Sequence, residues 1–328
     1  MKSEKILLVG CGEIGSRHLQ ALGKIEIPIE LWIIDPNLDS LKTGKERFEQ
    51  IPINKNIKSV EFQTELPETL NKIDLCIIST TSKIRFSVFQ EVTNKTSCKN
   101  FILEKVLFQD KEAYFEAGKI SKEKGITCWV NNYRREERYW KDIRKLFVNK
   151  GNFELFYGNA DWHLCTNIIH ILDLVTWLSN EKISKIDCSK LNKKIFDSKR
   201  SGFIELTGIV TGTTSDNGSF KLESISDIPY NEVEFVISNK TARLNVKEEK
   251  GEAILMRKEN NWAPEKQKVE IRFQSDVTHH VVKSILETNH CNLPTLEEST
   301  HIHIPVLDCI MNHVNKISDK KYKRCPIT

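Results

Sequence analysis

The chain has 328 residues, more than one hydrophobic core usually supports, so we expect two domains. Hydrophobic residues make up 39% of it and charged residues 29%, as in an ordinary globular protein, and no apolar run approaches the 18 residues of a membrane span. The net charge of +4, spread over the whole length, gives no basis for binding nucleic acid.

The N-terminus and the cysteines indicate the compartment. The first residues run directly into an apolar segment and leave no room for a signal peptide. None of the nine cysteines forms a C-x-x-C pair, and several lie in apolar runs, where a thiol acts as a small hydrophobe. We therefore expect a cytoplasmic protein with reduced thiols. The histidine pairs at 279–280 and 301–303 lack the helical spacing of a two-histidine metal site, so no metal is expected.

The first predicted strand, residues 5–9, leads directly into the glycine motif GCGEIG at 10–15. A helical pattern follows, with Leu19 and Leu22 on one face, and a second apolar run at 31–34 ends in Asp35. This is the pattern of a dinucleotide-binding unit, which consists of a strand, G-x-G-x-x-G, a helix, a second strand and an acidic residue about 20 residues past the last glycine. The alternative is a glycine-rich turn in a similar domain that binds nothing.

Each part of the motif has a physical role in that prediction. Gly10 makes the tight turn, Gly12 lets the backbone approach a pyrophosphate, and Gly15 lets helix and strand pack closely. The first helical residues, Glu13 and Ile14, offer backbone N–H groups and the positive end of the helix dipole to the phosphates.

Asp35 indicates which dinucleotide is bound. Its carboxylate can accept hydrogen bonds from both hydroxyls of an adenosine ribose and would repel a 2′-phosphate. The next residues, Pro36 and Asn37, supply no cation for such a phosphate. We predict NAD rather than NADP as the cofactor.

Three more apolar runs, at 75–78, 101–103 and 126–130, alternate with helical stretches such as 113–122. This alternation predicts an α/β fold with a doubly wound parallel sheet, in a Rossmann domain over residues 1–126. Ligands bind such sheets beyond the carboxyl ends of the strands. The residues there are Ser79 and Thr80 after the third strand and Glu104 and Lys105 after the fourth.

The pattern of residues 127–328 predicts a second domain, of α+β class. A basic helix over 133–147, a strand over 153–157 and a helix over 167–178 come first. Alternating polar and apolar residues, separated by polar turns, then predict a mostly antiparallel open sheet. Its expected strands lie at 203–206, 219–223, 232–237, 241–246, 253–256 and 269–273, and closing helices at 277–287 and 300–316.

Two side chains are candidates for proton chemistry. Lys105 lies where the nicotinamide end of a dinucleotide would lie, and it could hydrogen-bond a substrate oxygen or pass a proton. His170, with Asp173 on the same helix face, could act as a general base near neutral pH. The alternatives are a surface lysine that ends a strand and a hydrogen-bonded core histidine.

Polar residues around these positions are candidates for the substrate pocket. They are Asn131, Arg134, Trp162, His163 and Asn167. Arg134, with its neighbour at position 135, could pair with a carboxylate or phosphate or face solvent as helix charge. Asn167 could instead be the N-cap of its helix.

Together these features resemble the Gfo/Idh/MocA family, named for glucose–fructose oxidoreductase and inositol dehydrogenase. The match rests on the glycine motif, the strand and turn at 74–82, the Glu-Lys motif at 104–105, and the histidine helix that reads IHILD at 169–173. The resemblance implies hydride transfer at a secondary alcohol of a sugar, sugar nucleotide or cyclitol, with Lys105 as the active-site lysine and His170 as the acid/base. It also implies a homodimer or homotetramer. The stretch 162–170 is similar to a variant met in surface-polysaccharide biosynthesis.

Several positions depart from the family pattern. Val106 replaces the usual proline, Arg85 stands where a histidine is common, and Thr166 replaces an aspartate four residues before His170. Thr166 cannot carry a proton at neutral pH. The main hypothesis is therefore an NAD-dependent dehydrogenase or reductase. The alternatives are a non-catalytic NAD(H)-binding sensor or scaffold and an epimerase that reduces and reoxidises its NAD in one turnover.

Overall fold

The computed structural model describes residues 3–226 and 232–328. The chain forms two compact units, one of Met1–Glu136 and Arg272–Glu297 and the other of Glu137–Ile271 and Glu298–Thr328. The expected boundary after residue 126 differs from this division at two points. Residues 127–130 form the last strand of the first sheet, and residues 272–297 return to the first unit.

The first unit contains a parallel six-stranded sheet, which confirms the predicted Rossmann-type fold class. Its strand order is β3-β2-β1-β4-β5-β6, and every neighbouring pair is parallel. The central strand is buried on both faces, since Ile6, Leu7 and Leu8 are fully buried. The strands are β1 (Glu4–Val9), β2 (Ile29–Ile34), β3 (Ile57–Gln63), β4 (Leu75–Ile78), β5 (Asn100–Leu103) and β6 (Thr127–Val130).

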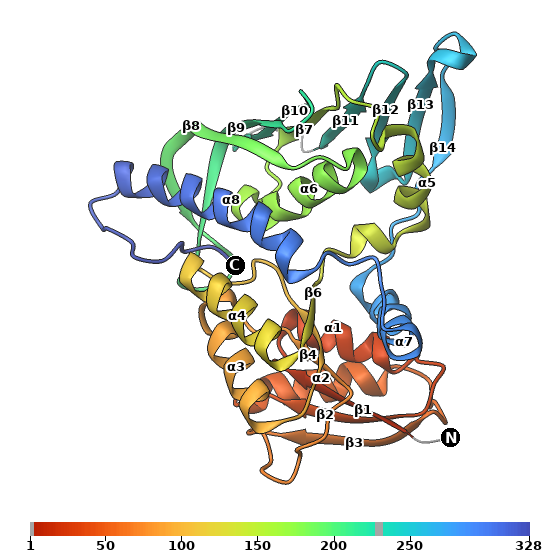
Figure 1. Ribbon diagram of the computed structural model, residues 1–328, viewed down its shortest axis with the longest axis vertical. Coiled ribbons are helices and arrows are strands. Elements are labelled where there is room, and N and C mark those ends of the chain that lie inside the picture. The colour runs from red at the N-terminus through yellow and green to blue at the C-terminus, as the bar shows by residue number, and fades with distance from the viewer. Residues whose placement is uncertain (1–2, 227–231) are drawn as a thin grey trace. The chain divides into compact units, whose positions relative to one another are not determined.

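Helices cover both faces of this sheet. Figure 1 shows α1, α2 and α7 on one face and α3 and α4 on the other. Val281 and Ile285 of α7 join the core formed by Leu19, Leu22 and the apolar strands, so a late segment of the chain completes the first unit. The helices are α1 (Glu13–Leu22), α2 (Leu38–Glu49), α3 (Ser82–Lys95), α4 (Lys111–Lys124) and α7 (Thr278–Thr288), with short 3₁₀ turns η1 (Tyr133–Glu136) and η4 (Gln274–Asp276).

The second unit contains an eight-stranded sheet of order β14-β13-β12-β11-β7-β10-β9-β8. Among the described strands, β7 and β10 pair in parallel and the other neighbouring pairs are antiparallel, so the predicted, mostly antiparallel sheet is confirmed. Its strands are β7 (Glu154–Ala160), β8 (Ile183–Asp197), β9 (Ile204–Thr214), β10 (Ser219–Ser224), β11 (Glu234–Ser238), β12 (Ala242–Lys247), β13 (Glu252–Arg257) and β14 (Glu265–Lys268). The 3₁₀ turns η2 (Glu248–Lys250) and η3 (Lys258–Asn260) flank β13.

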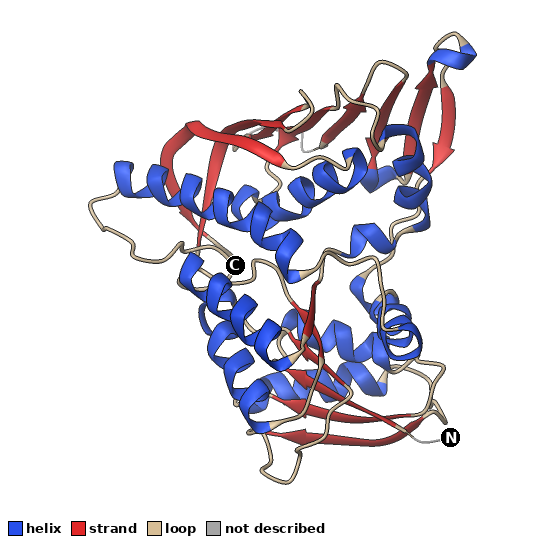
Figure 2. Ribbon diagram, in the orientation of Figure 1, coloured by secondary structure: helices blue, strands red, loops and turns tan. Residues whose placement is uncertain are grey.

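Three helices of this unit lie along one face of the sheet, as Figure 2 shows. They are α5 (Arg138–Phe147), α6 (Leu164–Ser179) and α8 (Leu296–Ile317). The hydrophobic side of α6 is the most extensive, and its residues Ile168, Leu172 and Val175 are fully buried. α6 therefore contributes to the core of the second unit.

Several predicted elements are corrected by the structure. The expected helix over 133–147 is broken at the extended residue Glu137 into η1 and α5. The expected strand over 269–273 is irregular. The paired strands end at Lys268 opposite Glu252, Val269 N still donates a hydrogen bond to Gly251 O at 2.8 Å, and the residues after it follow an irregular path. The long strand β8 and the edge strand β3 were not predicted, since both are partly exposed and lack an unbroken apolar run.

The cysteine prediction is wrong for one pair. Cys188 of β8 and Cys309 of α8 form a disulfide, with their Cα atoms 5.8 Å apart. The two residues are 121 positions apart in the chain, and α8 brings them together by packing beside the sheet. The remaining seven cysteines are free thiols, and all seven are buried.

Candidate nucleotide site and histidine helix

The glycine motif forms the loop between β1 and α1, and two of its glycines are sterically required. Gly10 has a φ of +91°, which side chains rarely adopt, and a Cβ there would lie 2.9 Å from Thr80 N. A Cβ on Gly15 would lie only 1.9 Å from Gly10 O. Gly12 differs, because a Cβ there would meet no atom within 4 Å. Gly12 thus leaves open space at the N-terminus of α1, where it is the N-cap and no side chain caps the helix.

Asp35 holds this loop from the end of β2. Its Oδ2 accepts a hydrogen bond from Cys11 N at 2.7 Å, and its Oδ1 accepts one from Asn37 N at 2.9 Å. Each carboxylate oxygen has a second lone pair, so both can still accept hydrogen bonds from ribose hydroxyls. Glu13, on the first turn of α1, pairs with Arg47 of α2 at 2.9 Å. Arg47 is a cation near the loop that the sequence did not indicate.

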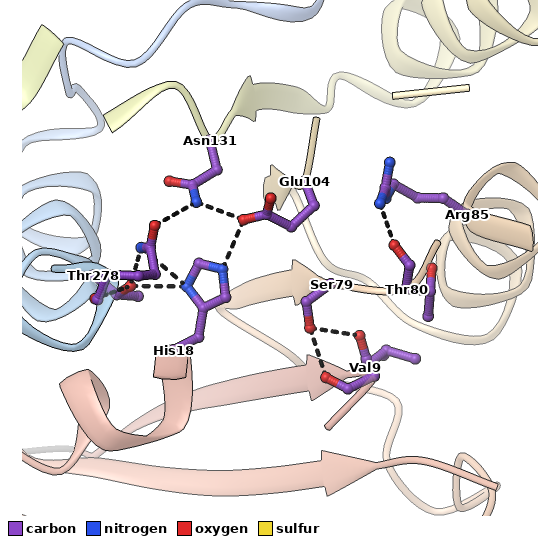
Figure 3. Close-up of polar contacts among 10 residues, drawn as sticks. Val9, His18, Ser79, Thr80, Arg85, Glu104, Asn131 and Thr278 are labelled. Carbon is purple, nitrogen blue, oxygen red and sulfur yellow. Dashed lines mark hydrogen bonds and ion pairs between the residues drawn. The ribbon is translucent and has the colours of Figure 1, made fainter. Parts of the chain in front are cut away.

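The two hydroxyl residues after β4 have different surroundings (Figure 3). Ser79 Oγ donates to Gly10 O at 2.6 Å and contacts Val9 O at 3.2 Å, so it fixes the glycine loop. Thr80 Oγ1 is buried and has no hydrogen-bond partner among the described residues. A buried hydroxyl beside the glycine loop without a partner is costly unless a ligand or water hydrogen-bonds to it.

Glu104, after β5, belongs to a buried polar network that joins three parts of the chain (Figure 3). His18 of α1 places Nε2 2.9 Å from Glu104 Oε1 and Nδ1 2.8 Å from Thr278 Oγ1. Asn131 Nδ2 donates to Glu104 Oε1 at 2.5 Å and to Gln274 Oε1 at 2.8 Å. Asn131, expected to contact substrate, therefore has its amide group within this network.

The network keeps Glu104 ionised although it is only 5% exposed. Burial alone would raise the pKa of Glu104, but the hydrogen bond and charge of His18, the charge of Lys105 and the hydrogen bond from Asn131 together hold it below its usual value. The sequence showed no partner for Glu104, because His18 and Asn131, which bond to it, lie 86 and 27 positions away in the chain. Glu104 is thus a fixed negative charge next to Lys105.

Lys105 itself is half-buried, and its peptide bond to Val106 is cis. The loop around it is held by Arg85 of α3, whose guanidinium is buried. Arg85 donates to the carbonyl oxygens of Val106 and Thr80 and, at 2.9 Å, to that of Leu107. Arg85 therefore ties the loop after β5 to the loop after β4. Arg134 is half-buried in η1, and its neighbour Arg135 is buried rather than facing solvent.

In the second unit, three of the residues expected to bind substrate, Trp162, His163 and Asn167, lie together at the start of α6. His163 is the N-cap, with a φ of +55°, so the helix begins at Leu164 and Asn167 is not its cap. Asn167 Nδ2 donates to Trp162 O at 2.7 Å. Trp162 is buried, packs edge-on against Tyr157 and donates from Nε1 to Glu223 O at 2.9 Å.

His170 lies farther along α6 and is half-buried, whereas Asp173 on the same helix is buried. Position 166, one turn before His170, carries the neutral Thr166. Its hydroxyl and backbone N–H both contact Glu205 of β9. Glu205 was missed by sequence analysis, because it sits on a different element 39 residues away.

The described residues contain neither a candidate membrane span nor a candidate metal cluster. No helix within residues 3–226 and 232–328 has the length and hydropathy needed to cross a membrane. Over the same residues, no cluster of three or more His, Cys, Asp or Glu side chains could hold a metal ion.

No family model and no curated protein matches this sequence. Solved structures do match the fold. UDP-N-acetylglucosamine 3-dehydrogenase GnnA from Acidithiobacillus ferrooxidans superimposes with a TM-score of 0.69 at 10% identity, over 97% of this chain and 100% of that one. The chain shares its two-domain fold.

Two further solved structures have the same fold. A levoglucosan dehydrogenase in complex with NADH matches with a TM-score of 0.68 at 14% identity, over 97% of this chain and 98% of that one. A super-repressor mutant of Gal80p from Saccharomyces cerevisiae matches with a TM-score of 0.71 at 12% identity, over 97% of this chain and 100% of that one. The resemblance expected from the glycine, Glu-Lys and histidine motifs is therefore confirmed at the level of the fold.

Proposed function

We propose that this protein is an NAD-dependent oxidoreductase that moves a hydride to or from a secondary alcohol or ketone of a sugar, sugar nucleotide or cyclitol. The observation that carries the proposal is the glycine loop, where the open space at Gly12 and the uncapped start of α1 lie beside Asp35. Enzymes with this fold include a levoglucosan dehydrogenase and a UDP-N-acetylglucosamine 3-dehydrogenase, which supports a sugar-type substrate.

The residues present fit NAD. Gly12, Glu13 and Ile14 would face the pyrophosphate at the start of α1. The spare lone pairs of Asp35 would accept the ribose hydroxyls, and the unpartnered Thr80 hydroxyl would hydrogen-bond the cofactor. When bound, the nicotinamide ring supplies or accepts the hydride at C4.

His170 and Lys105 are proposed as the reacting side chains. In the oxidative direction the substrate carbon loses a hydride and its hydroxyl loses a proton, which a ring nitrogen of His170 accepts. Lys105 donates a hydrogen bond to the substrate oxygen, and its charge also helps to hold the pKa of the neighbouring Glu104 below its usual value. Arg134 and the Trp162–Asn167 segment are proposed to bind the substrate. We also propose a cytoplasmic homodimer or homotetramer, without nucleic-acid or membrane partners.

A second candidate function is a non-catalytic NAD(H)-binding sensor. Position 166 carries a neutral threonine, and Gal80p, described as a super-repressor mutant, has the same fold. Such a protein would bind NADH tightly but form no oxidised or reduced product from any sugar. Direct product analysis separates the two functions, since a closed redox cycle would also leave the absorbance at 340 nm unchanged.

The enzymatic proposal predicts a specific effect of removing His170. His170→Ala is expected to lower kcat by about 100-fold or more, because the loss of a general base typically costs 10²–10⁴-fold. NADH affinity should change less than twofold. A panel of sugars and sugar nucleotides is incubated with NAD⁺ and the products are separated by chromatography. His301→Ala, which removes an exposed helical histidine, is the matched control. Unchanged turnover in His170→Ala would remove His170 from the mechanism.

A further inference from the structure

A buried carboxyl group from β9 is attached to the first turn of the helix that carries His170. Glu205 is 7% exposed. Its Oε2 accepts a hydrogen bond from Cys165 N at 2.8 Å, and its Oε1 accepts one from Thr166 N at 3.1 Å. Thr166 Oγ1 also hydrogen-bonds to Oε1. Both oxygens of this carboxyl group therefore accept hydrogen bonds from the same helical turn.

Part of this arrangement is explained by helix capping. The N-cap residue His163 makes no side-chain capping bond, so Glu205 supplies the acceptors for the N–H groups of the second and third helical residues. A capping role does not require deep burial. Here burial raises the pKa of Glu205, although the hydrogen bonds from Thr166 and Cys165 and the charge of His163 act in the opposite direction.

The geometry of α6 places His170 on the same side as this carboxyl group. Residues four apart on a helix share a face, so His170 lies one turn, about 6 Å, beyond Thr166. Helical side chains also lean toward the N-terminus and cover the turn before their own Cα. From helix geometry we expect the imidazole of His170 to lean toward the turn that Glu205 contacts.

We propose that Glu205 is a positioning residue of the candidate site, because its buried carboxyl group is hydrogen-bonded to Thr166, one helical turn from His170. The negative charge favours the protonated imidazole, and the hydrogen bonds fix the turn from which His170 projects. This inference rests on the proposed function, which gives His170 its chemical role.

The titration of His170 tests the inference without a substrate. In the full chain labelled with ¹³C at histidine Cε1, NMR follows each imidazole against pH, and the His170→Gln variant assigns the signal. Glu205→Gln is expected to lower the His170 midpoint by about 0.5 pH unit or more, because a charge at this range is worth of the order of 1 kcal/mol. Thr166→Val, which keeps the carboxyl group, should shift the midpoint less than half as far. An unchanged midpoint in Glu205→Gln would overturn the inference.

Moving the carboxyl group separates positioning from capping. The double variant Thr166→Asp, Glu205→Gln restores a carboxyl group one turn before His170. The expected results are a kcat about tenfold lower in Glu205→Gln with KM changed less than twofold, and recovery of both kcat and the midpoint in the double variant. A residue that only caps the helix would lower the unfolding temperature without shifting the midpoint, and that result would also overturn the inference.

The two proposals fail in different ways. If no variant and no wild-type preparation turns over any sugar, but the His170 midpoint shifts as expected, the proposed function fails and the coupling of Glu205 to His170 stands. If the wild-type protein turns over substrate and the midpoint does not move, the proposed function stands and Glu205 is only a cap.

Discussion

Replacing Gly15 with alanine is expected to abolish NADH binding and to lower the free energy of unfolding by about 3 kcal/mol. The cause is steric, because the new Cβ would lie 1.9 Å from Gly10 O and 2.7 Å from Ser79 Oγ. Relieving that clash must push α1 away from the end of β1, and the N–H groups of the helix would move with it. Intrinsic fluorescence in a urea series measures stability, and NADH fluorescence measures binding.

Two other glycines act as controls for this prediction. Gly12→Ala meets no atom within 4 Å, so stability should change by less than about 1 kcal/mol, while NADH affinity falls at least tenfold because the methyl group occupies the space for the pyrophosphate. Gly118→Ala, in the middle of α4, should raise stability by about 0.5 to 1 kcal/mol and leave binding unchanged. If Gly12→Ala binds NADH as tightly as the wild-type protein, the phosphate site is not at this loop.

Replacing His18 with leucine is expected to cost about 3 to 5 kcal/mol of stability at pH 7, because it leaves the buried carboxylate of Glu104 without its main partner. Replacing Glu104 by leucine in the same chain removes the unpaired charge, so the double variant should be more stable than His18→Leu alone. Lys24→Ala breaks a partly exposed ion pair with Asp276 and should cost less than about 1 kcal/mol. Urea unfolding measures the free energy of unfolding of the two single variants and the double variant.

The pH dependence gives a second check on the same pair. The pKa of Glu104 is lowered in the folded protein, so its stabilising contribution is present above the ordinary value of 4.5 and is lost as the pH falls through the folded pKa. Without His18, burial raises that pKa instead, and protonation at low pH relieves the unpaired charge. The cost of His18→Leu should therefore be smaller at pH 4.5 than at pH 7. An equal cost at both pH values would contradict the role of His18 as the partner of Glu104.

The features that could be predicted from sequence are those set by neighbouring residues. An apolar strand, a glycine turn, a helix and a second strand ending in Asp35 follow one another within 35 residues, and the structure has them in that form. The strands of the second unit could also be predicted, because a sheet with one solvent-exposed face alternates polar and apolar residues along each strand. The limits of elements were less predictable where pairing partners end, as at residues 269–273.

The features that could not be predicted depend on contacts between distant segments. His18 and Thr278 are 260 positions apart, and neither residue shows from its surroundings that it belongs to the network around Glu104. Glu205 reads as an alternating residue of a strand, and only the packing of α6 on β9 turns it toward Thr166. The Cys188–Cys309 disulfide has the same origin. Local patterns located the nucleotide loop, but not the polar partners that support it.

A fluorescence titration of the purified full chain with NADH and, in parallel, with NADPH is the direct test of the nucleotide site. Because Asp35 holds the loop with its carboxylate and would repel a 2′-phosphate, we expect saturable binding of NADH that is at least tenfold tighter than that of NADPH. Tighter binding of NADPH, or no binding of either by protein from which no retained cofactor can be extracted, would rule out the proposed NAD site.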